Sequence, residues 1–475
     1  MAGEDESYAR VPGMPRRRDM LLAVLAASLP GGRTQAAVPL TAPSSDHVLA
    51  LLTDEVDAGR NSVGMIAGLL DRSGRRLIAY GRADDAGSRP LDGDTVFEIG
   101  SVTKVFTALL LADMAERGEV ALTDPVTKYL PASVRMHELD GRPITLIDLA
   151  THTSGLPHRL ESPAPADPAN PYADFTVDQL YSFLSLYQPR LQPGTHYEYS
   201  NFGFGLLGHV LALRGGRTFE DLVVGRICDP LGLDSTRITL TASMQARLAA
   251  GHDYDLKPGR SWDLPTLPGA GALRSTTNDM LAFLEACLGR RRSPLAPAMA
   301  GLLEVRRPTG IKALDAGEGW LITTHDDDEL AWKDGLTNAY ASFIGYSTRS
   351  GLGMVLMSNA ANRADRLNLL GRYLLNPGRR LPAVHRQVSI DPALLEKYVG
   401  RYQLTPALVM TVTDAGGRLL VQTTGQRAYD LFPEGEAAFF YRAVDAQLTF
   451  EPGPDGDAAA LVLYQNGTTK RASRV

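Results

Sequence analysis

Segments with the character of β-strands occur at two places that lie far apart in the first 375 residues of this chain. Residues 63–70 and 75–81 are strand-like stretches on either side of a turn, and four similar stretches follow between residues 319 and 358. Short helical patterns and proline-rich loops fill the interval from about residue 122 to residue 267. Strands at both ends with helices between them predict one sheet that is interrupted by a helical insertion. Catalytic groups are expected where these two regions meet, because pockets tend to form there.

The sequence changes character near residue 378. At 475 residues the chain is too long for one typical domain. A linker-like sequence at residues 376–382 is followed, from about residue 391, by short alternating segments separated by Gly, Pro and Asp turns. This pattern predicts a small antiparallel β-domain. The predicted organisation is an N-terminal segment of residues 1–37, a first domain of residues 45–378 and a second domain of residues 391–475.

The N-terminal segment has the order of an export signal. Three arginines, Arg16 to Arg18, precede a short apolar stretch at residues 20–29, and small residues follow up to Ala37. The paired arginines resemble a twin-arginine signal, which predicts a bacterial protein that is exported to the periplasm or outside the cell. About ten apolar residues are too few to span a bilayer, so no stable membrane span is expected. A basic, disordered tail is the alternative, and Met14 would be a more usual first residue.

Composition and cysteine content argue against nucleic-acid binding and against a metal site. The chain is 44% hydrophobic and 21% charged, with a formal net charge of −6 and no run of more than three Lys or Arg in its body, so no nucleic-acid partner is expected. Cys228 and Cys287 could pair in an exported protein, although the apolar helical sequence around Cys287 favours a buried free thiol. The chain has no Cys/His cluster and no His-Glu-x-x-His motif, so no metal site is predicted.

The motif Ser101-x-x-Lys104 carries the first indication of chemistry. It follows a strand-like run that ends at Gly100, and it opens an apolar-periodic helix that extends to about Arg117. One helical turn separates Ser101 from Lys104, so both side chains lie on nearly the same face. A serine hydroxyl needs a base to become a good nucleophile, and a neutral lysine amine can be that base. The alternative is that Ser101 only caps the helix and Lys104 is solvated.

Tyr199 and Asn201 form a second candidate motif, just before a helix rich in small residues. A tyrosine near ammonium groups can act as general base and then as general acid. The amide of Asn201 could orient a substrate carbonyl. A tyrosine buried in the core is the alternative reading of Tyr199, because a similar Tyr-x-Asn spacing recurs at Tyr464.

A third motif lies at the end of a predicted strand, where Lys333, Gly335, Leu336 and Thr337 are the candidate substrate-binding residues. Lys333 could hold a substrate carboxylate or tune a neighbouring group. Gly335 would let a substrate approach the strand edge closely. The backbone N–H of Leu336, with that of Ser101, could form an oxyanion hole. An edge strand with a solvated lysine is the alternative.

With its three motifs in this order, the chain resembles the serine β-lactamase and penicillin-binding-protein superfamily, and within it the class C β-lactamase-like branch. Residues 149–157, Leu-Ala-Thr-His-Thr-Ser-Gly-Leu-Pro, also resemble that branch, and the likeness spans about residues 45–375. It implies an α/β (α+β) sandwich beside an all-helical region, and no cofactor. It also implies that Ser101 is acylated, that Lys104 is its base partner and that Tyr199 shuttles the proton. Residues 391–475 resemble the small β-domain appended to many members of this branch.

One position departs from the branch. Class C β-lactamases usually have Thr or Ser between the Lys and Gly of the third motif, and this chain has Asp334. An ionised Asp334 that faced the pocket would repel a substrate carboxylate, or it would pair with Lys333. Asn338 and Ala339 also stand where the branch often has two glycines. These departures put efficient turnover of penicillins in question, but not the acylation of Ser101.

The sequence therefore predicts an exported serine hydrolase that forms an acyl-enzyme on Ser101. The expected activity is that of a class C-like β-lactamase or of a D-Ala-D-Ala carboxypeptidase, with small β-lactams, peptides or cell-wall peptide as substrates. An esterase or D-aminopeptidase with the same machinery is the alternative. A non-catalytic wall-binding module is a third hypothesis, which the three intact motifs oppose. No Gly-x-Ser-x-Gly sequence is present, so a nucleophile elbow of the α/β-hydrolase type is not expected.

Overall fold

The computed structural model describes residues 42–84, 86–87, 89–158, 165–325, 328–361, 364–376, 381, 384–426, 428–441, 446–465 and 468–475. The predicted export signal at residues 1–37 lies outside the described residues. The chain divides essentially at Leu381 into two compact units, which we call the sheet unit and the barrel unit. Each of them is described by itself below.

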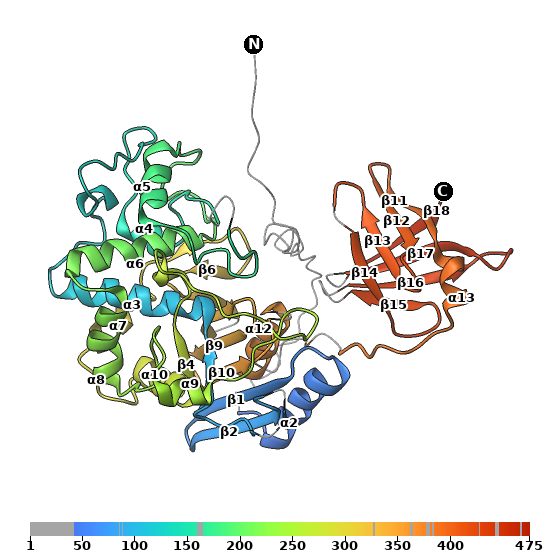
Figure 1. Cartoon of the computed structure of the whole chain (residues 1–475), viewed down its shortest axis with the longest axis horizontal. Coiled ribbons are helices and arrows are strands. Elements are labelled where there is room, and N and C mark those ends of the chain that lie inside the picture. Colours follow the sequence, from blue (N-terminus) through green and yellow to red (C-terminus); the bar gives the residue numbers. More distant parts are fainter. Residues whose placement is uncertain are drawn as a thin grey trace, which may run out of the picture. The chain divides into compact units, whose positions relative to one another are not determined.

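The sheet unit is built on one antiparallel sheet of eight strands (Figure 1). The first N-terminal strand pairs with the last strand of the unit, so that Met65 lies opposite Ser358, and the second N-terminal strand pairs with the first. The predicted single sheet with a helical insertion is therefore confirmed. In spatial order the strands are β2 (Gly74–Gly81), β1 (Gly64–Asp71), β10 (Gly353–Ser358), β9 (Ala341–Ser347), β8 (Asp328–Leu336), β7 (Leu321–His325), β6 (Leu314–Ala316) and β5 (Arg307–Pro308).

Apolar side chains alternate between the two faces of this sheet, and helices cover both faces. On one face α2 (Ser45–Thr53) and α12 (Ala364–Leu375) pack against residues such as Ala67 and Trp332. On the other face α3 (Thr103–Glu116) and α10 (Thr277–Cys287) pack against residues such as Ile66 and Val355. Strand residues that are buried on both faces explain why the sequence of β1 is almost continuously apolar.

The remaining helices of the sheet unit form the helical region (Figure 1). A two-stranded sheet of β3 (Val96–Glu98) and β4 (Arg274–Thr276) brings the two ends of this region together. The helices are α4 (Leu146–Ala150), α5 (Val177–Leu186), α6 (Asn201–Gly215), α7 (Phe219–Val223), α8 (Asp229–Leu231), α9 (Ala242–Arg247) and α11 (Ala296–Gly301). π-helical turns η1 (Asp54–Ala58) and η4 (Val224–Cys228) and 3₁₀ turns η2 (Gly100–Val102), η3 (Val126–Lys128) and η5 (Pro268–Ala270) complete it.

The barrel unit is a closed antiparallel barrel, and the predicted all-β class of this region is confirmed. Its first and last strands pair directly, with Tyr402 opposite Arg474. A short helix α13 (Pro392–Leu395) and a 3₁₀ turn η6 (Glu396–Tyr398) precede the strands. These are β11 (Gly400–Thr405), β12 (Leu408–Asp414), β13 (Leu419–Thr423), β14 (Ala428–Pro433), β15 (Ala438–Tyr441), β16 (Ala446–Pro452), β17 (Ala458–Gln465) and β18 (Thr468–Arg474).

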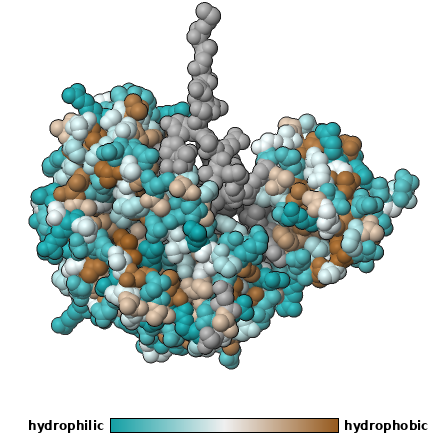
Figure 2. Space-filling model, in the orientation of Figure 1, coloured by the Kyte–Doolittle hydropathy of each residue, from teal (hydrophilic) through white to brown (hydrophobic). Residues whose placement is uncertain are grey.

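The surface is mainly polar on the face that Figure 2 draws, and the two cysteines are not paired. On the face drawn in Figure 2, hydrophilic residues predominate and hydrophobic residues are scattered among them. Cys228 is buried, Cys287 is partly buried, and both thiols are free, so the two cysteines do not pair. Burial raises the pKa of both thiols. Within the described ranges, no helix combines the length and apolar character needed to cross a bilayer.

Candidate active site

The nucleophile turn, which we define as residues 99–104, lies against the end of β8. Gly100 adopts a φ of +47°, and a Cβ atom added to it would lie 2.7 Å from the Leu336 nitrogen. A Cβ atom on Gly335 would likewise collide with the Ile99 carbonyl oxygen. Two glycines are therefore required for this approach, since any side chain would push the strand away from the turn. The predicted helix is confirmed after one 3₁₀ turn, as η2 continues directly into α3.

Lys104 points back at Ser101 from the first turn of α3. Its Nζ atom lies 2.9 Å from Ser101 Oγ, 2.8 Å from Asn201 Oδ1 and 2.5 Å from the Ala270 carbonyl oxygen. The side chain is completely buried. A carbonyl oxygen can only accept hydrogen bonds, so Ala270 and Asn201 each take one N–H. When the amine is neutral, its lone pair is therefore directed at the Ser101 hydroxyl.

Tyr199 contacts the same hydroxyl from the loop before α6. Its Oη lies 2.7 Å from Ser101 Oγ, and the residue is 6% exposed. The Lys104 amine lies 5.1 Å from the centroid of the Tyr199 ring, and the Lys333 amine lies 4.6 Å from it. A positive charge on either amine would favour the ionised form of the phenol, which is the form that can accept a proton.

Asn201 is held at the start of α6 by a helix cap. The Ser200 hydroxyl accepts a hydrogen bond from the Gly203 N–H at 2.8 Å and donates one to the Pro157 carbonyl at 2.6 Å. This cap fixes the first turn of the helix, from which the Asn201 side chain reaches Lys104. The structure thus brings Ser101, Lys104, Tyr199 and Asn201 into one cluster, although they come from segments about 100 residues apart.

Lys333 and Asp334 are buried side by side on β8. Their side chains are 1% and 2% exposed, and Lys333 Nζ lies 3.7 Å from Asp334 Oδ1. The separation is that of an ion pair rather than of a hydrogen bond. Asp334 therefore offsets the Lys333 charge on the side of the site where a substrate carboxylate would be held.

The two last residues of the third motif have different surroundings. Leu336 ends β8 beside the nucleophile turn, so its N–H and that of Ser101 lie on neighbouring stretches of backbone. Thr337 is 1% exposed, and its hydroxyl accepts a hydrogen bond from the Ala339 N–H at 3.4 Å. The Thr337 hydroxyl is thus engaged within the protein.

His152 is a residue of the cluster that the sequence did not single out. Its ring lies 4.3 Å from the Tyr199 ring, centroid to centroid, and its Nδ1 accepts a hydrogen bond from the Ser200 N–H at 3.0 Å. Its backbone has a φ of +58°, which few residues other than glycine adopt. The motif at residues 149–157, which resembles the class C-like branch, contains His152 and could have indicated it. The ring fixes both Tyr199 and the cap of α6.

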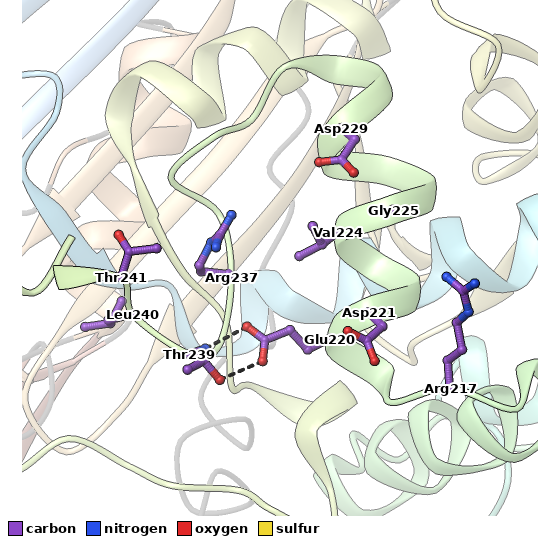
Figure 3. Close-up of a pocket in the computed structure, with 10 residues that line it drawn as sticks. All are labelled: Arg217, Glu220, Asp221, Val224, Gly225, Asp229, Arg237, Thr239, Leu240 and Thr241. Atoms are coloured by element: carbon purple, nitrogen blue, oxygen red, sulfur yellow. Dashed lines mark hydrogen bonds between the residues drawn. The ribbon is translucent and has the colours of Figure 1, made fainter. Parts of the chain in front are cut away.

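A second hollow lies elsewhere in the helical region (Figure 3). It has a volume of about 500 Å³ and is lined by residues such as Arg217, Asp229 and Arg237. Its central carboxylate, Glu220, accepts hydrogen bonds from the Ile238 and Thr239 N–H groups at 2.8 and 2.7 Å. None of the predicted site residues lines this hollow.

Comparison with known families agrees with this geometry. The family profile described as "Beta-lactamase" matches residues 49–376, which is more than half of the chain. The chain belongs to the beta-lactamase family. It is a serine hydrolase of the β-lactamase type. Residues 385–472 match a second profile, described as a domain of unknown function, DUF3471.

Several relatives of this beta-lactamase family member are bacterial proteins. Penicillin-binding protein 4* of Bacillus subtilis is 27% identical over 430 residues, which cover 83% of this chain and 91% of that protein. The D-alanyl-D-alanine-carboxypeptidase/endopeptidase AmpH of Escherichia coli is 30% identical over 296 residues, which cover 61% of this chain and 75% of that protein. A class C beta-lactamase of known structure shares the fold, with a TM-score of 0.63, 19% identity, and coverage of 73% of this chain and 99% of that one.

Proposed function

We propose that the chain hydrolyses acyl substrates through an acyl-enzyme on Ser101. One observation carries the proposal: the Lys104 amine and the Tyr199 hydroxyl both lie within hydrogen-bond reach of the Ser101 Oγ atom, at 2.9 and 2.7 Å. A partly buried nucleophile with two candidate proton acceptors fits covalent catalysis.

Acylation then follows from the positions of these groups. Ser101 Oγ attacks the substrate carbonyl carbon while its proton passes to the Lys104 amine or the Tyr199 phenolate. The carbonyl oxygen becomes an oxyanion that accepts hydrogen bonds from the N–H groups of Ser101 and Leu336. The bond to the leaving nitrogen or oxygen breaks, and Tyr199 donates a proton to that atom. If Lys104 took the serine proton, it passes that proton on to Tyr199. The product is an ester of Ser101, with the leaving group released or, in a ring, still attached.

Deacylation uses the same groups in reverse. A water molecule gives its proton to Tyr199 and attacks the ester carbon, the oxyanion forms again in the same place, and Ser101 Oγ leaves with a proton from Lys104 or Tyr199. Asn201, whose Oδ1 is held by Lys104, presents its NH₂ group toward the substrate amide. Free serine and a carboxylic acid result.

β-Lactams and D-Ala-D-Ala peptides are the first substrate class that we propose, because the names of the relatives refer to penicillin binding, β-lactamase and D-alanyl-D-alanine carboxypeptidase. Turnover of a penicillin and of a D-Ala-D-Ala peptide by the wild type and by Ser101→Ala tests this proposal. We expect hydrolysis by the wild type only. No turnover of either compound by a folded wild-type enzyme would exclude this substrate class.

A second candidate substrate class is favoured by Asp334, namely esters or amides without a carboxylate next to the reacting bond. The buried Asp334 carboxylate, 3.7 Å from Lys333, would lie near the carboxylate of a penicillin. Two carboxylates in one partly desolvated site oppose binding by about 1 kcal/mol or more. We therefore expect a nitrophenyl ester to be turned over in preference to a penicillin.

An Asp334→Thr variant tests the second candidate. Replacing the carboxylate by a hydroxyl should raise the ratio of penicillin to ester turnover by about tenfold. An unchanged ratio in a folded Asp334→Thr enzyme would show that Asp334 does not select substrates. Ser101→Ala is the control, because it should abolish both reactions.

We infer further that the protein is exported and consists of a hydrolase domain at residues 45–378 and a β-domain at residues 391–475. The Arg16–Arg18 sequence with its short apolar stretch supports export, and the two family matches support the division. Replacing Arg16 and Arg17 by lysine should retain the protein in the cytoplasm, as measured by cell fractionation. Export of that variant at the wild-type level would contradict a twin-arginine signal.

A further inference from the structure

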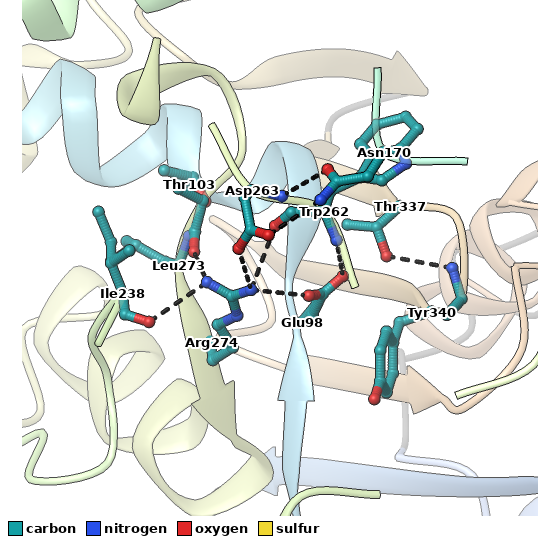
Figure 4. A network of polar contacts seen from close by, with 12 residues as sticks. Glu98, Thr103, Asn170, Ile238, Trp262, Asp263, Leu273, Arg274, Thr337 and Tyr340 are labelled. Carbon is teal, nitrogen blue, oxygen red and sulfur yellow. Dashed lines mark hydrogen bonds and ion pairs between the residues drawn. The ribbon is translucent and has the colours of Figure 1, made fainter. Parts of the chain in front are cut away.

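A buried ion pair lies directly behind the nucleophile turn (Figure 4). The Arg274 Nη2 atom lies 3.0 Å from Glu98 Oε1, and the two side chains are 10% and 2% exposed. The same guanidinium donates to the carbonyl oxygens of Trp262, Ile238 and Ala272 at 3.1, 3.2 and 3.2 Å. Arg274 therefore uses its planar fork to fix four acceptors from separate segments.

The residue next to Arg274 holds the nucleophile turn on both sides of Ser101. The Leu273 carbonyl accepts a hydrogen bond from the Ile99 N–H at 3.1 Å. The Leu273 N–H donates to Thr103 Oγ1 at 3.1 Å. Glu98 stands three residues before Ser101, and Ile99 and Thr103 stand on either side of it. The Leu273 backbone thus hydrogen-bonds to residues on both sides of Ser101, and Leu273 is followed directly by Arg274, the partner of Glu98.

The same segment supplies the acceptor that orients Lys104. Its Nζ atom lies 2.5 Å from the carbonyl oxygen of Ala270, two residues before Ala272, whose carbonyl is bonded to Arg274. A displacement of residues 270–274 would therefore move the base and the nucleophile turn together.

Glu98 also reaches the other half of the expected oxyanion hole. Burial raises the pKa of Glu98, an interaction with the Thr337 side chain lowers it, and Thr337 directly follows Leu336, which would supply the second N–H group. The Thr337 N–H donates to the Tyr340 carbonyl oxygen at 3.0 Å, and the Tyr340 hydroxyl donates to the Ala249 carbonyl at 2.7 Å. Glu98 thus stands in the backbone that precedes Ser101 and interacts with Thr337, the residue that follows Leu336.

A contribution to stability does not by itself account for the burial of the Glu98–Arg274 ion pair. Burial raises the pKa of Glu98, and the charge of Arg274 and the hydrogen bonds from Thr337 and Ser261 oppose that rise. Buried ion pairs are often no more stabilising than apolar residues of the same volume, so their presence calls for a further reason.

We propose that Glu98 and Arg274 are positioning residues, which hold the Ser101 and Leu336 N–H groups at the spacing that the oxyanion requires. The inference rests on the proposed function, because it assigns a role within the same reaction. It predicts that loss of the pair weakens binding of the transition state much more than binding of the substrate.

Three variants test the inference. Glu98→Gln removes the charge of the pair, and Thr337→Val removes only the hydroxyl that reaches Glu98. The matched control is Glu55→Gln, because Glu55 and Arg366 form another buried ion pair, at 2.6 Å with 2% and 12% exposed side chains, that none of the contacts given above connects to Ser101. The measurements are kcat and KM for the best ester or penicillin substrate, and the affinity of a boronic acid, which forms a tetrahedral adduct with the serine.

We expect Glu98→Gln and Thr337→Val to lower kcat by about tenfold to a hundredfold with KM changed less than about threefold, and to weaken boronate binding in parallel. Glu55→Gln should lower the melting temperature and leave kcat unchanged. If Glu98→Gln does not fold, Thr337→Val alone decides. A kcat within about threefold of wild type in the folded variants, or the same loss in Glu55→Gln, would overturn the inference. A wild-type enzyme that is never acylated at Ser101 would instead contradict the proposed function.

Discussion

The sheet unit and the barrel unit bury different kinds of side chain. Among the residues that the structure describes, the buried charged side chains, such as Lys104, Lys333 and Glu98, belong to the sheet unit. The buried side chains of the barrel unit are aliphatic or aromatic, such as Leu448 and Tyr402. Burying an ionisable group costs several kcal/mol unless it is well paired, so a fold that needs only a core avoids it. The difference indicates that the chemistry lies in the sheet unit.

The largest expected effect comes from Lys104. A Lys104→Met variant keeps the apolar stem but removes the amine, so that the Ser101 proton loses one of its two candidate acceptors. We expect kcat/KM for acylation to fall by about 10⁴-fold. The matched control is Lys470→Met on the barrel surface, which should leave the rate unchanged. Similar losses of activity in both variants would contradict the conclusion that the chemistry lies in the sheet unit.

Tyr199→Phe is expected to have the next largest effect. The ring and its contact with His152 remain, and only the hydroxyl that returns the proton to the leaving group is lost. We expect kcat to fall by about 10³-fold, with a smaller loss for an ester that carries a good leaving group. Equal losses for good and poor leaving groups would show that the Tyr199 hydroxyl is not the proton donor.

A core substitution in the barrel should change stability without changing chemistry. Leu448 is completely buried, and Leu448→Ala is expected to lower the free energy of unfolding of the barrel unit by about 3 to 4 kcal/mol through the cavity left behind. All three tryptophans, Trp262, Trp320 and Trp332, belong to the sheet unit. Urea unfolding followed by circular dichroism should therefore shift, while tryptophan fluorescence and kcat stay unchanged. A parallel shift of the fluorescence would show that the two units do not unfold independently.

The smallest expected effect tests a buried charge that does not contact Ser101. Burial, with a smaller contribution from Glu304, raises the pKa of Glu318 from 4.5 to about 7. The unfolded carboxyl ionises above pH 4.5, so the wild type loses stability as the pH rises from 4.5 through 7. Glu318→Gln should be more stable than wild type by about 2 to 3 kcal/mol at pH 8 and nearly equal to it at pH 5. Equal unfolding free energies at pH 8 would show that burial does not raise the pKa of Glu318.

The sequence predicted the large features because they follow from local patterns. The strand segments at both ends of the sheet unit, the helix after Ser101 and the all-β region all have short-range signals. Strands β14 and β18 were not predicted. In β18 the sequence Thr-Thr-Lys-Arg-Ala-Ser-Arg buries only Ala472, so its pairing depends on the backbone of β11 and β17. Closure of the barrel is likewise a long-range property.

Within the candidate site, the residue types were predictable and their environment was not. The spacing of Ser101 and Lys104 on one helix face gives a local signal, whereas the Ala270 acceptor of Lys104 lies 166 residues away. The left-handed backbone of His152 and the pairing of Glu98 with Arg274 depend on tertiary contacts in the same way. Thr337 stays a prediction as a substrate-binding residue, and its hydroxyl accepts a hydrogen bond from the Ala339 N–H, a contact that no local pattern indicated.

The most direct measurement is mass spectrometry of tryptic peptides after a brief, acid-quenched reaction with a penicillin or a nitrophenyl ester. If Ser101 forms the acyl-enzyme, we expect an added acyl mass on the peptide that contains Ser101, and no added mass in Ser101→Ala. An acyl mass on another residue, or undiminished turnover by Ser101→Ala, would contradict it.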